Sequence, residues 1–402
     1  MPTNDEPPAS ADVVVVGGGV IGAACCLALA EAGLATVLVE AGRLGGGASG
    51  ACEGNLLVSD KRPGPELELA RRSLQLFPGL AERLETDVQL EAKGGLLVAL
   101  TAAALAELRR HGETMAAAGL RVEPLDPAAA LEAEPVLNPE LAGAALFAED
   151  MQLCPLRLVL ALARGAERHG ARVVQGCGLE RLVLDGGRVA AVETSRGRVA
   201  CGDVVLAAGV ASAGIAAAVG LDLPLVGRRG QILVSAPHPG LIRRKVYDFG
   251  YQATIESRGA GVEVATVLET TRRGNVLIGA SREFGDSAAA PDIDVNARLA
   301  AGALELAPGL GGLEILRSYA GVRPAIEDGL PAIGPAAGLD GLDLEAKFPI
   351  DAAFVHQIHA AGLKLYTWTV DDPAIARAFA AAGVDGLTTN RPGWMREQLT
   401  AA

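Results

Sequence analysis

A run of four valines, Val13–Val16, leads directly into the glycine pattern Gly17-x-Gly19-x-x-Gly22. A continuous β-branched run predicts a fully buried parallel strand. Residues 20–33 then place small residues and leucines at helical spacing, and residues 35–40 form a second apolar run. This order predicts one strand–helix–strand unit close to the start of the chain, and so an α/β fold.

The spacing of the glycines indicates a dinucleotide-binding turn. Gly17 would form the tight turn, Gly19 would let the backbone approach a pyrophosphate, and Gly22 would allow close packing of helix on strand. Glu40, at the end of the second strand, would accept hydrogen bonds from the adenosine ribose. The alternative is a glycine-rich structural turn with a surface glutamate. The pattern alone does not separate NAD from FAD.

The loop after Glu40 is a candidate for holding a second phosphate. It contains small residues together with Arg43 and Ser49, whose side chain and neighbouring amides could bind phosphate oxygens. The alternative is a flexible surface loop.

Composition excludes several other classes of function. The net charge of −13 and the 3% aromatic content argue against nucleic-acid binding. The N-terminus has no basic region, so we expect no secretory signal. The uncharged stretch Val13–Ala30 is interrupted by glycines and predicts a strand–turn–helix, not a transmembrane segment.

The cysteines are expected to be reduced thiols in a cytoplasmic protein. No C-x-x-C pair occurs among them, and their spacing predicts neither a metal site nor a disulfide framework. The six are Cys25, Cys26, Cys52, Cys154, Cys177 and Cys201.

The rest of the chain alternates between two kinds of pattern. We expect α/β elements, then an antiparallel sheet over about 224–283, which suggests two intertwined domains. The α/β part is predicted as a strand at 93–101, a helix at 102–119, a helix and strand over 154–174, a meander at 179–201 and a strand at 203–209. The tail has a strict strand–helix rhythm, with strands at 341–345, 363–370 and 384–390 and helices at 351–361, 372–382 and 393–399.

Several segments carry a family resemblance. They are VVVVGGGVIGAACCLALAEAGLATVLVEAGRLGGGASG, MQLCPLRLVLALARGAERHGARVV, VVLAAGVAS, GNVLIGASREF and SYAGVRPAIEDGLPAIGP. The chain from about 11 to 341 resembles the D-amino-acid oxidase/glycine oxidase class of FAD-dependent oxidoreductases. GNVLIGASREF most resembles the branch that holds hydroxyproline dehydrogenase and opine oxidase subunits.

The resemblance implies a Rossmann-like FAD-binding domain intertwined with a mixed-sheet α+β substrate domain. A flexible lead, residues 1–10, would precede them. The implied FAD-binding parts are about 11–75, 150–220 and 315–341, and the implied substrate-binding parts are about 76–149 and 221–314.

The resemblance also implies site residues. It places FAD on Gly17, Gly19, Gly22, Glu40, Arg43, Ser49, Leu179, Ala208 and Gly209. It places Arg323, expected just after a strand, on a substrate carboxylate, a bidentate pairing that arginine suits. The alternative for Arg323 is an ion pair with Glu327 or Asp328. Tyr247 and Tyr251 are candidates to close the pocket, the alternative being ordinary strand aromatics.

The implied reaction passes a hydride from the carbon beside an amine to flavin N5 and leaves an imine, which hydrolyses in water. The substrate would be an amino or imino acid. Whether oxygen or a partner subunit reoxidises the flavin stays open. No Ser-His-Asp or Cys-His arrangement is visible in the sequence, and this chemistry needs none.

The end of the chain departs from that family. AGLKLYTWTVDDP and AAGVDGLTTNRPG resemble the C-terminal end of a glycerophosphodiester phosphodiesterase, a TIM-barrel family, over 342–402. This fragment stands where the oxidase family has a segment that caps the flavin. A natural fusion, an error in gene assembly and an artificial recombination all match this pattern.

The tail leaves three interpretations of function. The first is an FAD-dependent oxidoreductase, impaired if the missing cap is essential. The second is a non-catalytic or defective flavoprotein hybrid that associates through exposed strand edges. The third, a phosphodiesterase, lacks the earlier barrel strands that supply that family's catalytic groups. His356 and His359 are expected as solvated helix residues, with metal ligation as the alternative.

Overall fold

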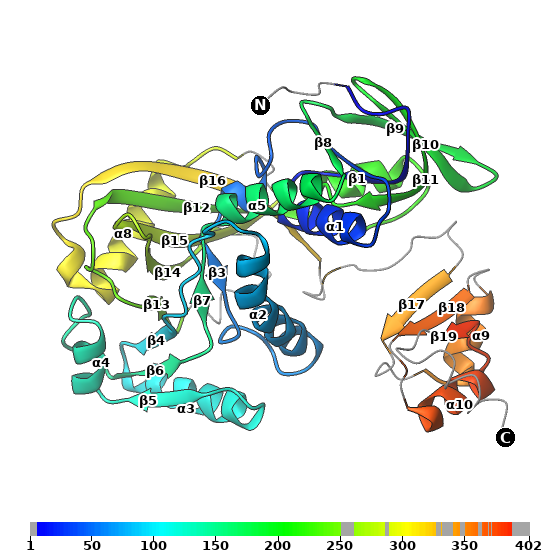
Figure 1. Ribbon diagram of the computed structural model, residues 1–402. Helices are drawn as coiled ribbons and strands as arrows, with labels where there is room; N and C mark the ends of the chain where they lie inside the picture. Colours follow the sequence, from blue (N-terminus) through cyan, green and yellow to red (C-terminus); the bar gives the residue numbers. More distant parts are fainter. Residues whose placement is uncertain are drawn as a thin grey trace.

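The computed structural model describes residues 6–250, 261–285, 289–326, 331, 341–345, 350–360, 364–368, 370 and 372–387. Two large sheets form the framework of most of the chain, and a small third sheet lies in the tail (Figure 1).

The first sheet has six strands in the order β8-β2-β1-β11-β10-β9. Its strands are β1 Ser10–Val16, β2 Thr36–Glu40, β8 Arg172–Gln175, β9 Leu179–Asp185, β10 Arg188–Thr194 and β11 Gly197–Leu206. The strands β8, β2, β1 and β11 are parallel, while β10 and β9 run antiparallel as a meander. Helices α1 (Val20–Glu31) and α5 (Pro155–Arg168) pack together over one face. The predicted strand–helix–strand unit is confirmed.

One prediction in this sheet is wrong. The meander and the strand at 203–209 were expected to be separate, but β11 is continuous through Gly202. Its first half pairs antiparallel with β10, and its second half pairs parallel with β1. Glycine and aspartate at 202–203 resemble a turn locally, yet a partner strand on each half keeps the backbone extended.

The second sheet has eight strands in the order β16-β12-β15-β14-β13-β4-β6-β5. They are β4 Gly95–Ala99, β5 Val122–Leu125, β6 Gly143–Phe147, β12 Val226–Pro237, β13 Lys245–Asp248, β14 Glu263–Thr270, β15 Asn275–Phe284 and β16 Ile315–Ala325. Neighbours pair antiparallel except β13 and β4, which are parallel. The predicted antiparallel sheet is confirmed. β16 lies at its edge, whereas residues 315–341 were expected with the FAD-binding parts.

Each face of the second sheet has its own core. Apolar side chains of α8 (Ile293–Leu306) and α4 (Pro127–Ala133) cover one face. Those of α2 (Pro65–Arg83) and α3 (Ala102–Ala117) cover the other. Helix α3 begins where predicted because the Thr101 hydroxyl accepts a hydrogen bond from Ala104 N at 3.2 Å.

Short elements connect the two sheets. They are the 3-10 turns η1 Ala48–Gly50 and η2 Gly209–Ala211, the helix α6 Ser212–Ala217, and a two-stranded pair of β3 Asn55–Leu56 with β7 Met151–Gln152. A third 3-10 turn, η3 Pro308–Leu310, lies between α8 and β16. The chain leaves the first sheet after β2 and returns to it at β8, having built β4, β5 and β6 of the second in between. This interleaving is the intertwined arrangement expected from the sequence.

The tail forms a parallel sheet of its own (Figure 1). Its strands are β17 Gly341–Glu345, β18 Lys364–Trp368 and β19 Gly386–Leu387, and its helices are α9 Ala352–Ala360 and α10 Pro373–Ala382. The predicted strand–helix rhythm is confirmed over these elements. The helix expected at 393–399 lies outside the described residues. Within the described part of the chain, no helix is long and apolar enough to span a membrane.

Candidate functional site

The turn after β1 tolerates only glycine at two positions. Gly17 has φ +111°, and a Cβ there would lie 2.4 Å from the Ala207 carbonyl oxygen. A Cβ on Gly22 would lie 1.9 Å from the Gly17 carbonyl oxygen. Both distances are far below van der Waals contact. The turn and the first helical turn therefore pack directly on each other and on the end of β11.

The N-terminus of α1 is open to an anion. Gly19 stands at the cap position with no side-chain cap, and the first turn carries no acidic residue. The Ser49 hydroxyl accepts a hydrogen bond from Val20 N at 3.0 Å. The second loop is thereby held against the start of the helix, where unpaired N–H groups and the helix dipole favour phosphate.

Glu40 organises the far side of this turn. Its two carboxylate oxygens accept hydrogen bonds from Gly18 N and Gly42 N, each at 2.7 Å. The Glu40 carbonyl accepts a hydrogen bond from Cys177 N at 2.8 Å, which brings the start of β9, and with it Leu179, to the same edge. The Arg43 side chain is exposed on this loop.

The carboxyl end of β11 completes the group. Ala207 N donates a hydrogen bond to the Val16 carbonyl at 2.9 Å, so Ala208 lies beside Gly17. Gly209 follows in the left-handed region at φ +60°. The structure therefore gathers all nine residues predicted for the cofactor at one edge of the first sheet. A glycine cradle, an open helix terminus and a carboxylate together match the needs of a dinucleotide.

Arg323 lies inside β16, not after a strand as predicted, because β16 continues to pair with β12 through Ala325. Its half-buried side chain lies over Gly230, where a Cβ would be 2.2 Å from Nη1. Nη1 donates a hydrogen bond to the Ser281 carbonyl at 3.3 Å. Glu327 and Asp328, its alternative partners, lie outside the described residues.

The segment 51–53 connects the two halves of the site. It follows η1 and Ser49 directly and crosses the face of the second sheet over two more glycines. A Cβ on Gly321 would lie 2.6 Å from the Ala51 Cβ, and one on Gly279 would lie 2.0 Å from Glu53 Oε1. The cofactor loop thus runs onto the same sheet as Arg323.

Sequence reasoning missed this segment. The available signal was one acidic residue, Glu53, in the otherwise apolar and small-residue run from 51 to 54, close to the predicted phosphate loop. The pKa of the Cys52 thiol is raised to about 11, chiefly by burial; the nearby charge of Glu53 contributes to the rise, and that of Arg323 opposes it. Cys52 therefore stays a thiol, and Glu53 and Arg323 both lie within its electrostatic surroundings.

Tyr247 and Tyr251 were the two candidates to close the substrate pocket, and the structure describes only the first of them. Tyr247 is 2% exposed and packs in the apolar cluster that includes Leu97 and Val267. That is the environment of an ordinary strand aromatic, the alternative stated above, and not of a residue that closes an open pocket. Tyr251 lies outside the described residues.

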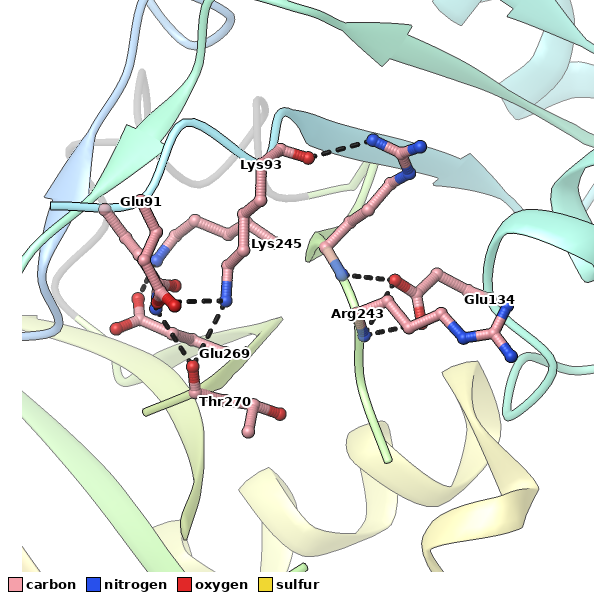
Figure 2. A network of polar contacts seen from close by, with 9 residues as sticks. Glu91, Lys93, Glu134, Arg243, Lys245, Glu269 and Thr270 are labelled. Carbon is pink, nitrogen blue, oxygen red and sulfur yellow. Dashed lines mark hydrogen bonds and ion pairs between the residues drawn. The ribbon is translucent and has the colours of Figure 1, made fainter. Parts of the chain in front are cut away.

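A buried polar network supports the second sheet (Figure 2). Lys245 and Glu269, on adjacent strands β13 and β14, form an ion pair and are 1% and 2% exposed. Lys93 Nζ donates to the Thr270 carbonyl at 3.1 Å, and burial lowers the pKa of Lys93. Gln152 Nε2 donates to Glu91 Oε2 at 2.6 Å. The network ties β14 to β7 and to the segment that leads into β4.

Beside this network, Glu134 accepts hydrogen bonds from the backbone N–H groups of Arg243 and Arg244 (Figure 2). Burial raises the pKa of Glu134. These contacts fix the start of β13.

The cysteines and the two histidines of α9 were also considered as possible metal ligands in the sequence. All six cysteines are free, and three of them are buried. His359 on α9 is not simply solvated, because its Nε2 lies 2.8 Å from Asp385 Oδ2 while its side chain is 41% exposed. His356 is exposed. Among the described residues, no group of three or more potential metal ligands occurs.

The fold and the site define a class. The family model described as FAD dependent oxidoreductase matches residues 12–346, and this chain belongs to that family. A second model, that of the glycerophosphoryl diester phosphodiesterase family, matches residues 324–394. The oxidoreductase part and the tail fragment were both indicated by the sequence.

Several individual proteins to which the chain is similar are glycine oxidases. The chain is similar to a glycine oxidase of Geobacillus kaustophilus, with 33% identity over 345 residues, 83% of this chain and 87% of that one. It is 31% identical to a glycine oxidase of Pseudomonas putida over 68% of this chain and 71% of the relative. The solved structure of the Geobacillus kaustophilus glycine oxidase matches with a TM-score of 0.74 and 30% identity, covering 81% of this chain and 86% of that one.

Proposed function

We propose that this FAD-dependent oxidoreductase oxidises an amino or imino acid at the carbon that carries the nitrogen. The observation that carries the proposal is the position of Arg323, whose guanidinium lies over Gly230 on the sheet that the cofactor loop reaches through residues 51–53. A guanidinium at such a place can clamp a carboxylate in two hydrogen bonds. The glycine oxidases among the relatives make an amino acid the natural class of substrate.

We assign the cofactor contacts to the nine gathered residues. Glu40 would accept the ribose hydroxyls, with Leu179 beside the adenine. The N-terminus of α1 with Gly17, Gly19 and Gly22 would hold the pyrophosphate, helped by Ser49 and Arg43. Ala208 and Gly209, at the end of β11, would lie along the ribityl chain.

FAD when bound supplies the acceptor for two electrons and one hydrogen. The chain's own residues then bind and orient the substrate. Arg323 holds the carboxylate, so that the C–H bond beside the nitrogen faces the cofactor, and the segment 51–53 limits the space around it. The imine product leaves this site and hydrolyses in water.

The tail supports a second candidate, a flavoprotein hybrid with weak or no turnover. The observation that favours it is the phosphodiesterase-family match over 324–394, which begins inside β16 and overlaps the last part of the oxidoreductase match. Three parallel strands in a sheet of their own also present edges for association. A phosphodiesterase activity would need barrel strands beyond β17, β18 and β19.

A substrate panel tests the proposal. The purified, FAD-loaded protein would be assayed with glycine, sarcosine, D-alanine, L-proline, hydroxyproline and an opine, using an artificial electron acceptor. Turnover of one of these and not of its amine-free analogue supports the proposal. FAD binding without turnover of any panel member supports the hybrid. Release of glycerol phosphate with a divalent metal would support the phosphodiesterase.

A further inference from the structure

A buried carboxylate in the site has no assigned task. Glu53 is 7% exposed, and its Oε1 has no hydrogen-bond partner among the residues that the structure describes. A buried carboxylate normally accepts hydrogen bonds or pairs with a cation, because desolvation of an unpaired charge is costly. Oε1 therefore lacks a donor that a ligand could provide.

Glycines line the sheet face next to Glu53. Oε1 points at Gly279 on β15, where a Cβ would come within 2.0 Å. Gly321 on β16 lies under Ala51, and Gly230 on the adjacent strand β12 lies under the Arg323 guanidinium. Gly230 and Gly321 are paired in register. One anion and one cation thus share a sheet face on which three positions carry no side chain.

The other carboxylate close to this face is already paired. Glu269 binds Lys245 in the buried ion pair. Four charged groups act on the pKa of the Cys52 thiol, namely Glu53, Arg323, Glu269 and Lys245. Glu269 and Lys245 compensate each other. The remaining pair of opposite charges, Glu53 and Arg323, matches the two charges of a zwitterionic amino acid.

We propose that Glu53 binds the ammonium or secondary ammonium group of the substrate while Arg323 binds its carboxylate. This inference rests on the proposed function. The Glu53 carboxylate takes one proton from the substrate nitrogen and becomes a carboxylic acid. The hydrogen of the adjacent C–H bond, with its two electrons, would then pass to the acceptor that bound FAD supplies, and the nitrogen lone pair would form the C=N bond of the iminium product. Glu53 returns its proton to water after product release.

Binding of a ligand that cannot react tests this assignment separately from turnover. 2-Aminoisobutyrate has no hydrogen on the carbon beside nitrogen, and pivalate is the same shape with a methyl group in place of the ammonium. Calorimetry on the FAD-loaded protein should show 2-aminoisobutyrate binding at least about tenfold more tightly than pivalate, the size expected for a charge-assisted hydrogen bond. Glu53→Gln should abolish this preference, and Glu53→Asp should retain part of it.

Matched controls separate binding from folding. Glu91→Gln changes a carboxylate that bonds Gln152 in the neighbouring network, and it should leave the preference unchanged. FAD content and the thermal unfolding temperature would be measured for each variant. The proposal is overturned if wild type shows no preference for 2-aminoisobutyrate, if Glu53→Gln keeps it, or if Glu53→Gln weakens both ligands equally. Failure of every amino acid to reduce the flavin in wild type would instead count against the proposed function.

Discussion

At the scale of single residues, Gly22 offers the sharpest test of the cofactor turn. Gly22→Ala would put a methyl group 1.9 Å from the Gly17 carbonyl, so we expect about 1–3 kcal/mol of destabilisation and loss of bound FAD. The measurements are FAD content after reconstitution and thermal unfolding. Gly214→Ala in α6, where a Cβ meets nothing within 4 Å, should retain FAD. Equal FAD content in the two variants would contradict the account.

Arg323 gives the second residue-scale prediction. Arg323→Ala removes the proposed carboxylate clamp, and we expect KM for the amino acid to rise on the order of 10–100-fold with FAD content unchanged. Arg323→Lys should fall between the two, because lysine keeps the charge but not the two-pronged geometry. Steady-state kinetics across substrate concentration measures this. An unchanged KM in Arg323→Ala would remove Arg323 from the substrate site.

The residues that could be predicted from sequence are those with a local signal. Gly17 and Gly22 follow the first strand, and Glu40 ends the second. Because the two strands are parallel, this spacing alone places the three residues at one edge of the sheet. Glu53 stands out in the sequence as an acidic residue, but its burial could not be predicted, because its environment depends on Gly279, more than two hundred residues further along the chain. Arg323 was found through family resemblance, but its position inside a strand required the pairing of β16 with β12.

At the scale of elements, the pair of Lys245 and Glu269 joins β13 to β14. Lys245→Met leaves Glu269 buried without its cation, and we expect a loss of about 3–5 kcal/mol. The double variant Lys245→Met/Glu269→Leu should recover most of that loss, since it leaves no unpaired charge. Urea unfolding of the three proteins measures the effect. A double variant no more stable than the single one would show that the pair does more than balance its own charges.

The buried carboxyl group of Asp150, next to β7, predicts that the free energy of unfolding depends on pH. It is fully buried beside β7 and accepts hydrogen bonds from Val58 N and Ser59 N. Burial raises its pKa from 3.8 to about 7. The folded state therefore binds this proton more tightly than the unfolded chain does, and the protonated form favours folding.

Stability should accordingly fall as pH rises from about 4 to about 7, by an amount on the order of a few kcal/mol from this group. Asp150→Asn does not titrate and should lose this part of the slope. The measurement is the free energy of unfolding of both proteins at pH 4.5 and 7.5. An identical pH slope in the two proteins would show that Asp150 does not titrate in this range.

Elements were predictable where their pattern was uninterrupted. Helices α1, α3 and α5 and the strands of the first sheet follow from periodicity and end signals. Helix α2 was not predicted, since Pro78 and Gly79 lie inside it and normally end a helix. Helix α8 was also missed. The continuity of β11 depends on two different neighbours along one strand, which local sequence does not show.

At the scale of the whole molecule, the chain joins most of an FAD-dependent oxidoreductase to a fragment of another family. The two family matches overlap between 324 and 346. The edge of the second sheet, β16, carries Arg323, and the tail sheet begins sixteen residues after β16 ends. The central question is therefore whether the cofactor and substrate sites work together in a chain with this ending.

The visible spectrum of the FAD-loaded protein, recorded without oxygen before and after adding the amino and imino acid panel, tests this most directly. We predict a bound-flavin band that bleaches with one class of amino or imino acid and persists in Arg323→Ala at the same concentration. A protein that cannot be loaded with FAD, or a flavin band that no panel member bleaches, would contradict the account and favour the defective hybrid.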